Sequence, residues 1–349
     1  MANGINRRKA LAGGTAAIGG IIGLSNGCSR EPVEKESRYI NPGRESEPVK
    51  NLSVGKSAVR LASFGHRLDY PGQDRITEMV RSIRDAGYTA ASCHTSIGHR
   101  NQWLDVPDAE ISELKEALKT YDVDPFDVMI WTNLIHPDSR TRQTNLAYAA
   151  ENIEAAERIG ARMVTAVTGS CDPDYYIAAH LDNWSEGTWK LTVESIRQLL
   201  RDTSGMKASL GVEAVVTTNI DGPAAHKRLM EDVGDERCRV CLDPINMTSL
   251  ANAYHTTETL DECFNLLGES ILGCHAKDVI IERDRMLLHL TESRACTGLL
   301  DYETYLTQLS RMQWPRTLLI EHIPADQYAV AKGDIIDIAE HLGVTIHGT

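Results

Sequence analysis

Four short hydrophobic runs in the second half of the chain each end in a side chain that can bind a metal ion. These side chains are Glu213, Asp243, His275 and Glu321. Successive members are 30, 32 and 46 residues apart, and one strand plus one helix of a parallel α/β barrel takes about 30 residues. The spacing therefore predicts one acidic or imidazole group at the end of each of four consecutive strands, where such barrels carry their catalytic residues.

The rest of residues 56–349 alternates between strand-like and helix-like segments. Four earlier strands are expected at 58–64, 89–94, 127–133 and 162–167. Helices are expected at 75–86, 109–118, 140–159, 186–200, 223–231, 250–267, 301–312 and 334–342. Eight strands alternating with helices predict a single-domain (β/α)8 TIM barrel. An open doubly wound sheet is the alternative, but no G-x-G-x-x-G sequence follows the first strand.

The first 55 residues do not follow this pattern. Arg7 and Arg8 precede a weakly hydrophobic, Gly/Ala-rich stretch, so residues 1–28 resemble a twin-arginine export signal. Residues 24–28 resemble a lipoprotein cleavage box, which makes Cys28 a candidate lipid anchor; an ordinary basic N-terminus is the alternative. Residues 29–55 lack apolar periodicity and are expected to form a flexible tether. We therefore expect an exported protein that is periplasmic or membrane-tethered.

The net charge argues against one class of partner, and the cysteine spacing argues against a disulfide framework. The formal net charge of -13 argues against a nucleic-acid partner, because phosphate binding requires clustered Lys and Arg. The eight cysteines show no disulfide framework, and the Cys238–Cys241 pair is interpreted as two buried thiols because Cys241 falls in an expected strand. A homo-oligomer is compatible with this composition.

Several short motifs carry a resemblance to a known family. Gly-Val-Glu213, Leu-Asp243-Pro, His275-Ala-Lys277-Asp278 and Leu-Ile-Glu321 resemble the metal site of the sugar phosphate isomerase/epimerase superfamily. This xylose isomerase-like group of barrels also contains ketose 3-epimerases, inosose dehydratases and endonuclease IV. Supporting similarities occur at 133–138, 155–161, 183–184 and 297–302. The resemblance covers about residues 57–345 and implies the same barrel fold.

The resemblance also implies the composition of the site. Glu213, Asp243, His275 and Glu321 would bind one divalent metal ion (Mn, Mg, Co or Zn), and in the epimerase branch the two glutamates also act as acid and base. Three carboxylates and one imidazole suit such an ion. A divalent cation polarises a sugar carbonyl and adjacent hydroxyl, while one carboxylate removes a proton from carbon and a second returns one. Taken alone, Asp243 could instead cap the turn that follows it.

Four further residues are candidates for binding substrate. Lys277 could hold a substrate oxygen or form a salt bridge, and His136 could contact substrate or close its own turn. Trp184 could stack on a sugar face or anchor a loop. Asn246 occupies a position where ketose 3-epimerases usually have a substrate-contacting histidine, and this departure counts against a plain ketohexose 3-epimerase.

The sequence thus predicts a metal-dependent isomerase or epimerase that acts through an enediolate. Export favours a non-phosphorylated sugar or polyol as the substrate. The alternative is a lyase that performs β-elimination on 3-keto-glycosides. An endonuclease IV-like phosphodiesterase would need more ligands, which His94, His136 and His180 could supply. A non-catalytic sugar-binding lipoprotein would not need both Glu213 and Glu321.

Overall fold

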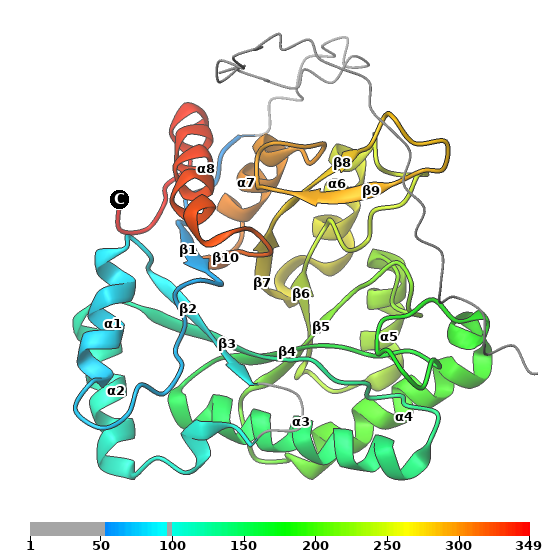
Figure 1. Ribbon diagram of the computed structural model, residues 1–349, viewed down its shortest axis with the longest axis horizontal. Helices are drawn as coiled ribbons and strands as arrows, with labels where there is room; N and C mark the ends of the chain where they lie inside the picture. The colour runs from blue at the N-terminus through cyan, green and yellow to red at the C-terminus, as the bar shows by residue number, and fades with distance from the viewer. Residues whose placement is uncertain (1–52, 96–99) are drawn as a thin grey trace, which may run out of the picture. The chain divides into compact units, whose positions relative to one another are not determined.

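Eight parallel strands form the central sheet of the protein. The computed structural model describes residues 53–95 and 100–349. The strands are β1 (Val59–Ser63), β2 (Ala90–Thr95), β3 (Asp124–Ile130), β4 (Met163–Val167), β5 (Ser209–Glu213), β6 (Cys238–Leu242), β7 (Ile271–Ala276) and β10 (Arg316–Ile320). They pair in the order β1-β10-β7-β6-β5-β4-β3-β2, with the helices around them (Figure 1). The expected (β/α)8 TIM barrel is confirmed.

The two ends of this pairing order lie side by side. The backbone N–H of Thr89 donates to the carbonyl of Leu61 at 3.0 Å, and Leu68 N–H donates to Ser92 at 2.9 Å. These bonds join the β1 and β2 regions, so the barrel is nearly closed. Its interior is filled by a small apolar cluster that includes Phe126, Met163 and Cys241.

Within the described ranges, eight α-helices follow these strands in turn, seven as connections and α8 after the last strand. They are α1 (Ile76–Asp85), α2 (Asp108–Thr120), α3 (Ser139–Ile159), α4 (Glu186–Asp202), α5 (Pro223–Val233), α6 (Thr256–Leu267), α7 (Tyr302–Ser310) and α8 (Tyr328–Leu342). The ends of α3 lie within one residue of the expected bounds because residues at both ends cap the helix. Asp138 accepts the N–H of Thr141 at 2.8 Å as an N-cap, and Gly160 ends the helix at φ 86°, a conformation that glycine adopts without a steric cost.

Two helices begin elsewhere than the sequence predicts. Helix α6 begins at Thr256 rather than at residue 250. The Asn252 side chain accepts the N–H of Ser249 and donates to the carbonyl of Met247, which stabilises a turn in place of the first helical turn. Helix α8 begins at Tyr328, six residues before the expected start, and buries Tyr328 and Ala331 on the same face as its later apolar residues.

A two-stranded antiparallel hairpin follows β7 and was not predicted. It consists of β8 (Asp278–Ile281) and β9 (Leu290–Ser293). The hairpin accounts for the 46-residue interval between the last two predicted ligands, which exceeds one strand and one helix. In Figure 1 it lies above β7, at the carboxyl end of that strand.

The N-terminal predictions fall mostly outside the described residues. The signal at 1–28, the anchor at Cys28 and nearly all of the tether lie in residues 1–52. Within the described ranges, none of the helices combines the length and apolar character needed to cross a membrane.

Candidate metal centre

The four predicted ligands converge at one end of the barrel. Glu213 ends β5, Asp243 follows β6, His275 lies in β7 and Glu321 follows β10. These strands are consecutive neighbours in the sheet, so the side chains occupy one continuous half of the rim. One ligand atom from each residue lies within 4.8 Å of the others. All four residues are buried, with at most 3% of each exposed.

The imidazole of His275 faces the three carboxylates without a good hydrogen bond to any of them. Its Nδ1 is 3.4 Å from Glu213 Oε1, 3.7 Å from Asp243 Oδ2 and 3.4 Å from Glu321 Oε1. Among the described residues, neither His275 Nδ1 nor Glu321 Oε2 finds a hydrogen-bond partner. Buried polar atoms are rarely left without partners, and three carboxylates with one imidazole are suitable ligands for a divalent cation. The residues present therefore fit a metal ion.

Asp243 uses its two oxygens differently. Oδ1 accepts the backbone N–H groups of Ile245 at 2.9 Å and Asn246 at 3.3 Å, so it caps the following turn. Oδ2 faces the cluster, 3.7 Å from His275 Nδ1. The turn-capping and ligand interpretations of Asp243 are therefore compatible, because each involves a different oxygen.

Lys277 places a buried amine among the same acids. Its Nζ lies 2.8 Å from Asp243 Oδ2, 2.9 Å from Glu321 Oε1 and 3.3 Å from Glu292 Oε1. Burial works to lower the pKa of Lys277, but the surrounding carboxylates hold it well above its usual value. The ammonium group thus offsets part of the repulsion between the acids.

The two glutamates differ in proton affinity. Burial raises the pKa of Glu213 above its usual value. Burial acts in the same direction on Glu321, but the charges of His275 and Lys277 outweigh it and hold the pKa of Glu321 well below its usual value. Environments that separate the pKa values of two carboxyl groups are typical of an acid and a base working as a pair.

Asn246 contacts the cluster, whereas His136 and Trp184 have other partners. Asn246 Nδ2 donates to Glu213 Oε1 at 2.5 Å. His136 Nδ1 accepts the N–H of Asp138, and its Nε2 lies 3.1 Å from the carbonyl of Pro173, so both ring nitrogens contact nearby loops. Trp184 belongs to a separate cavity of about 300 Å3 beside α4 and α5, and its indole N–H donates to Asp221 at 3.0 Å.

Two residues near the cluster were missed from the sequence. Glu292 on β9 reaches Lys277 with one oxygen and lies 3.0 Å from His322 Nδ1 with the other. His322 has a φ of 55°, which is uncommon outside glycine and recurs at functional sites. His322 could have been predicted as a site residue because it directly follows Glu321 in the sequence. No sequence feature pointed to Glu292, because the hairpin that carries it was not expected.

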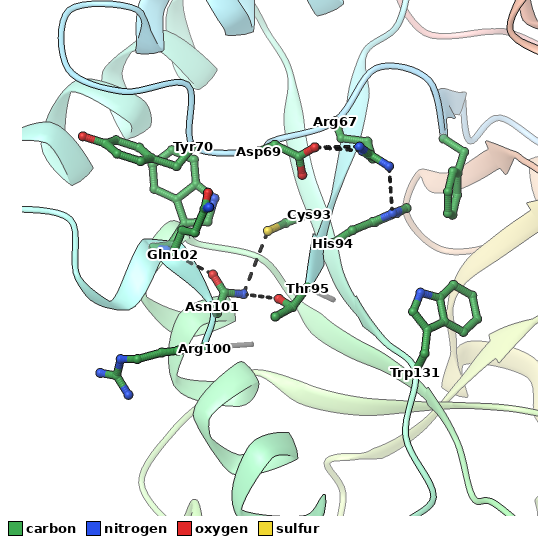
Figure 2. Close-up of a pocket in the computed structure, with 12 residues that line it drawn as sticks. Arg67, Asp69, Tyr70, Cys93, His94, Thr95, Arg100, Asn101, Gln102 and Trp131 are labelled. Carbon is green, nitrogen blue, oxygen red and sulfur yellow. Dashed lines mark hydrogen bonds and ion pairs between the residues drawn. The ribbon is translucent and has the colours of Figure 1, made fainter. Parts of the chain in front are cut away.

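A cavity of about 590 Å3 opens at the other half of the rim (Figure 2). Residues at the ends of β1, β2 and β3 line it, among them Arg67, Asp69, Tyr70, His94, Arg100 and Trp131. Figure 2 shows Arg67 between Asp69 and His94.

One wall of this cavity leads towards the metal cluster. The Phe64 ring packs against His94 at 4.0 Å between ring centroids and lies 6.1 Å from His322. Because His322 directly follows Glu321, this aromatic wall borders both the cavity and the ligand half of the rim.

The fold corresponds to that of a known group of proteins. The family model described as xylose isomerase-like TIM barrel matches residues 80–343. No curated protein matches the chain. Similar solved structures include endonuclease IV from Thermus thermophilus, with 15% identity, a TM-score of 0.61 and coverage of 81% of this chain and 99% of the other.

Two further structures are similar over comparable lengths. D-psicose 3-epimerase from Clostridium cellulolyticum has 11% identity and a TM-score of 0.59, covering 82% of this chain and 100% of the other. A xylose isomerase-like TIM barrel protein from Mycobacterium smegmatis in complex with magnesium has 15% identity and a TM-score of 0.58, covering 83% and 96%. At these identities the likeness shows the shared fold alone, while the family model covers most of the sequence. The chain therefore belongs to the xylose isomerase-like TIM barrel family.

Proposed function

We propose that the protein is a metal-dependent enzyme that isomerises or epimerises a non-phosphorylated sugar or polyol. The observation that carries this proposal is the convergence of Glu213, Asp243, His275 and Glu321, with their ligand atoms within 4.8 Å of one another. Magnesium in one similar structure and the sugar epimerase activity named for another support it.

The four side chains would hold one divalent ion. When bound, an ion of the Mn, Mg, Co or Zn type polarises a carbonyl oxygen and a neighbouring hydroxyl. The chain's own residues then supply the proton transfers. The pKa of Glu321 is held well below its usual value and that of Glu213 is raised, which favours Glu321 as the base and Glu213 as the acid.

In this assignment Glu321 removes the proton from the carbon next to the carbonyl, giving an enediolate. Glu213 then returns a proton to the intermediate. Asn246 holds Glu213 Oε1 in place through its 2.5 Å hydrogen bond. Lys277 keeps Glu321 ionised through the 2.9 Å ion pair. A positioned acid and base of this kind contribute about 10²–10⁴-fold each to a rate.

The cavity beside the cluster is the proposed binding place for the rest of the substrate. Trp131 and Tyr70 offer aromatic surfaces, and Arg67 and Asp69 offer polar groups for hydroxyls. Its volume of about 590 Å3 also favours a second candidate function, β-elimination on a 3-keto-glycoside, since that substrate carries an additional group next to the reacting sugar.

A phosphodiesterase of the endonuclease IV type has less support. Among residues 53–95 and 100–349, the four ligands already named are the one group of three or more His, Cys, Asp or Glu side chains close enough to hold a metal. His136 instead contacts the loop after β4 through the carbonyl of Pro173, and His180 contacts its own loop. A metal analysis that finds three ions per chain would favour that function over the proposed one.

The experiment is hydrogen exchange between substrate and solvent. Glu213→Gln and Glu321→Gln proteins are incubated in D₂O with a panel of free ketoses, cyclitols and 3-keto-glucosides, and deuterium incorporation is followed by NMR. We expect each variant to retain the wild-type circular dichroism spectrum and to lose exchange at least about 100-fold. Asp221→Asn, at the separate cavity, is the matched acid-to-amide control. Exchange at the wild-type rate in both glutamate variants would refute the mechanism.

The cellular location is a proposal from sequence alone. Residues 1–28 support export by the twin-arginine pathway, with Cys28 as the site of a lipid anchor. Cell fractionation tests it: an Arg7→Lys, Arg8→Lys protein should accumulate in the cytoplasm, and unchanged export would exclude this pathway.

A further inference from the structure

A buried thiol lies directly behind the imidazole of the metal cluster. Cys241 is on β6, two residues before Asp243, and its Sγ lies 3.3 Å from His275 Nε2 on the neighbouring strand β7. Both side chains are fully buried. The two ring nitrogens therefore face different groups: Nε2 faces sulfur inside the barrel, and Nδ1 faces Glu213, Asp243 and Glu321.

This arrangement matters because a neutral imidazole carries only one N–H. If the proton is on Nε2, it can be donated to the Cys241 sulfur, and the lone pair of Nδ1 is directed at the cluster. If the proton is on Nδ1, the nitrogen that faces the carboxylates has no lone pair to offer a cation. The group that accepts from the second nitrogen of a metal-binding histidine sets the tautomer and the ring orientation.

Within the described part of the chain, Nε2 of His275 has the sulfur of Cys241 as its hydrogen-bond partner. Cys241 packs in the barrel interior with Phe126, Met163 and Leu319, which offer no oxygen or nitrogen in their side chains. The usual acceptors behind a metal-binding histidine are a carboxylate, a backbone carbonyl or water, and here a thiol occupies that place.

We infer that Cys241 is a positioning residue that holds His275 as the Nε2–H tautomer, so that Nδ1 is the metal ligand. The inference rests on the proposed metal site and goes beyond it by assigning a role to a residue that is not a ligand.

The chain contains a matched control for this role. Cys274 is equally buried and directly precedes His275, but its side chain lies on the other face of β7, in the core between sheet and helices. Removing either sulfur creates a similar loss of packing. Only the Cys241 substitution removes a partner of the imidazole.

The test is Mn²⁺ binding by titration calorimetry on chelator-treated full-length protein. The His275 tautomer is read by ¹⁵N NMR on histidine-labelled samples loaded with diamagnetic Mg²⁺, because a metal-bound imidazole is neutral. Mn²⁺ is chosen because it prefers oxygen and nitrogen ligands over thiolate. We expect Cys241→Ala to weaken binding roughly 10–100-fold and to lower the Nε2–H population. Cys241→Ser, whose hydroxyl still accepts a hydrogen bond, should stay close to wild type, as should Cys274→Ala.

The outcomes separate this inference from the proposed function. If wild-type protein binds no divalent ion, the metal-dependent function fails and the inference fails with it. If wild-type protein binds Mn²⁺ and Cys241→Ala binds equally well, the inference alone is overturned. An equal loss in Cys274→Ala would assign the effect to core packing, and an equal loss in Cys241→Ser would exclude the hydrogen-bond role.

Discussion

A buried histidine in the ligand half of the rim (the ends of β5, β6, β7 and β10) and a partly buried one in the cavity half (the ends of β1, β2 and β3) have opposite environments. In the ligand half, burial acts to lower the pKa of His275, but Cys241 and the carboxylates of Glu321 and Glu213 outweigh it and raise the pKa well above its usual value. In the cavity half, burial and the charge of Arg67 lower the pKa of His94 to about 3. The same type of side chain is thus surrounded by acids in the ligand half and by aromatic and cationic groups in the cavity half.

The difference indicates that the two halves of the rim suit different functions. The ligand half concentrates negative charge and leaves His275 Nδ1 and Glu321 Oε2 without hydrogen bonds from the described residues, which suits cation binding and proton transfer. The cavity half holds a neutral His94 beside Phe64 and Trp131, which suits recognition of an uncharged substrate. The two halves should therefore respond differently to mutation, metal and pH.

The largest change in the free energy of unfolding should come from removing the ammonium group of Lys277, which lies in the ligand half. Lys277→Met leaves Asp243 and Glu321 buried without their countercharge, and breaking such a buried pair costs about 3–5 kcal/mol. Urea unfolding in the presence of a chelator measures this loss, and added Mn²⁺ should reduce it. Lys227→Met removes a surface pair with Glu231 and should cost less than about 0.5 kcal/mol. Similar losses in the two variants would contradict the proposed role of buried charge.

Metal addition should stabilise the protein through the ligand half alone. At about 100 times the dissociation constant, Mn²⁺ should add about 2.7 kcal/mol to the free energy of unfolding, and a chelator should reverse the change. His275→Ala should reduce this gain, whereas Trp131→Ala should retain it. Thermal and urea unfolding provide the measurement. A gain that survives in the His275 variant but disappears in the Trp131 variant would place the ion in the wrong half.

Low pH should reduce the free energy of unfolding, because His94 binds a proton more readily in the unfolded chain than in the fold. Its folded pKa of about 3 lies below the usual value of about 6.5, so the unfolded chain binds the proton more readily. The stabilising contribution of the neutral ring is complete above about pH 6.5 and is lost as the pH falls towards about 3. At about pH 5 the loss should be about 2 kcal/mol. A His94→Gln protein should show a correspondingly smaller drop in unfolding free energy between neutral pH and this acidic pH, and an identical drop would argue that His94 is protonated in the fold.

The smallest effect should come from the aromatic wall of the cavity. Trp131→Ala removes one ring that would face the substrate, a change worth about 1 kcal/mol, or roughly fivefold in KM. The dissociation constant for Mn²⁺ should stay unchanged, because the four predicted ligands all lie in the other half. Steady-state kinetics and calorimetry on the same preparation separate the two quantities. A weakened Mn²⁺ affinity with an unchanged KM would reverse the assignment of the two halves.

Much of the fold could be predicted because its signals are local. Helix α3 has a cap at Asp138 and a terminating Gly160, and each strand shows a hydrophobic run of the right length. The errors occurred where a side chain or a longer excursion overrides the local pattern. Asn252 replaces the first turn of α6 with its own hydrogen bonds, and the β8–β9 hairpin occupies a segment that has no distinctive periodicity.

The residue types and spacing of the sequence determined the eight-stranded barrel and the four side chains that meet at its rim. Strand ends in a parallel barrel converge at one edge, so regular spacing along the chain becomes proximity in space. Only the tertiary structure decided the contacts made across that rim. Lys277, Glu292 and Cys241 reach the cluster through distances and side-chain directions that depend on how neighbouring strands and the hairpin pack, and sequence separation carries no information about those distances.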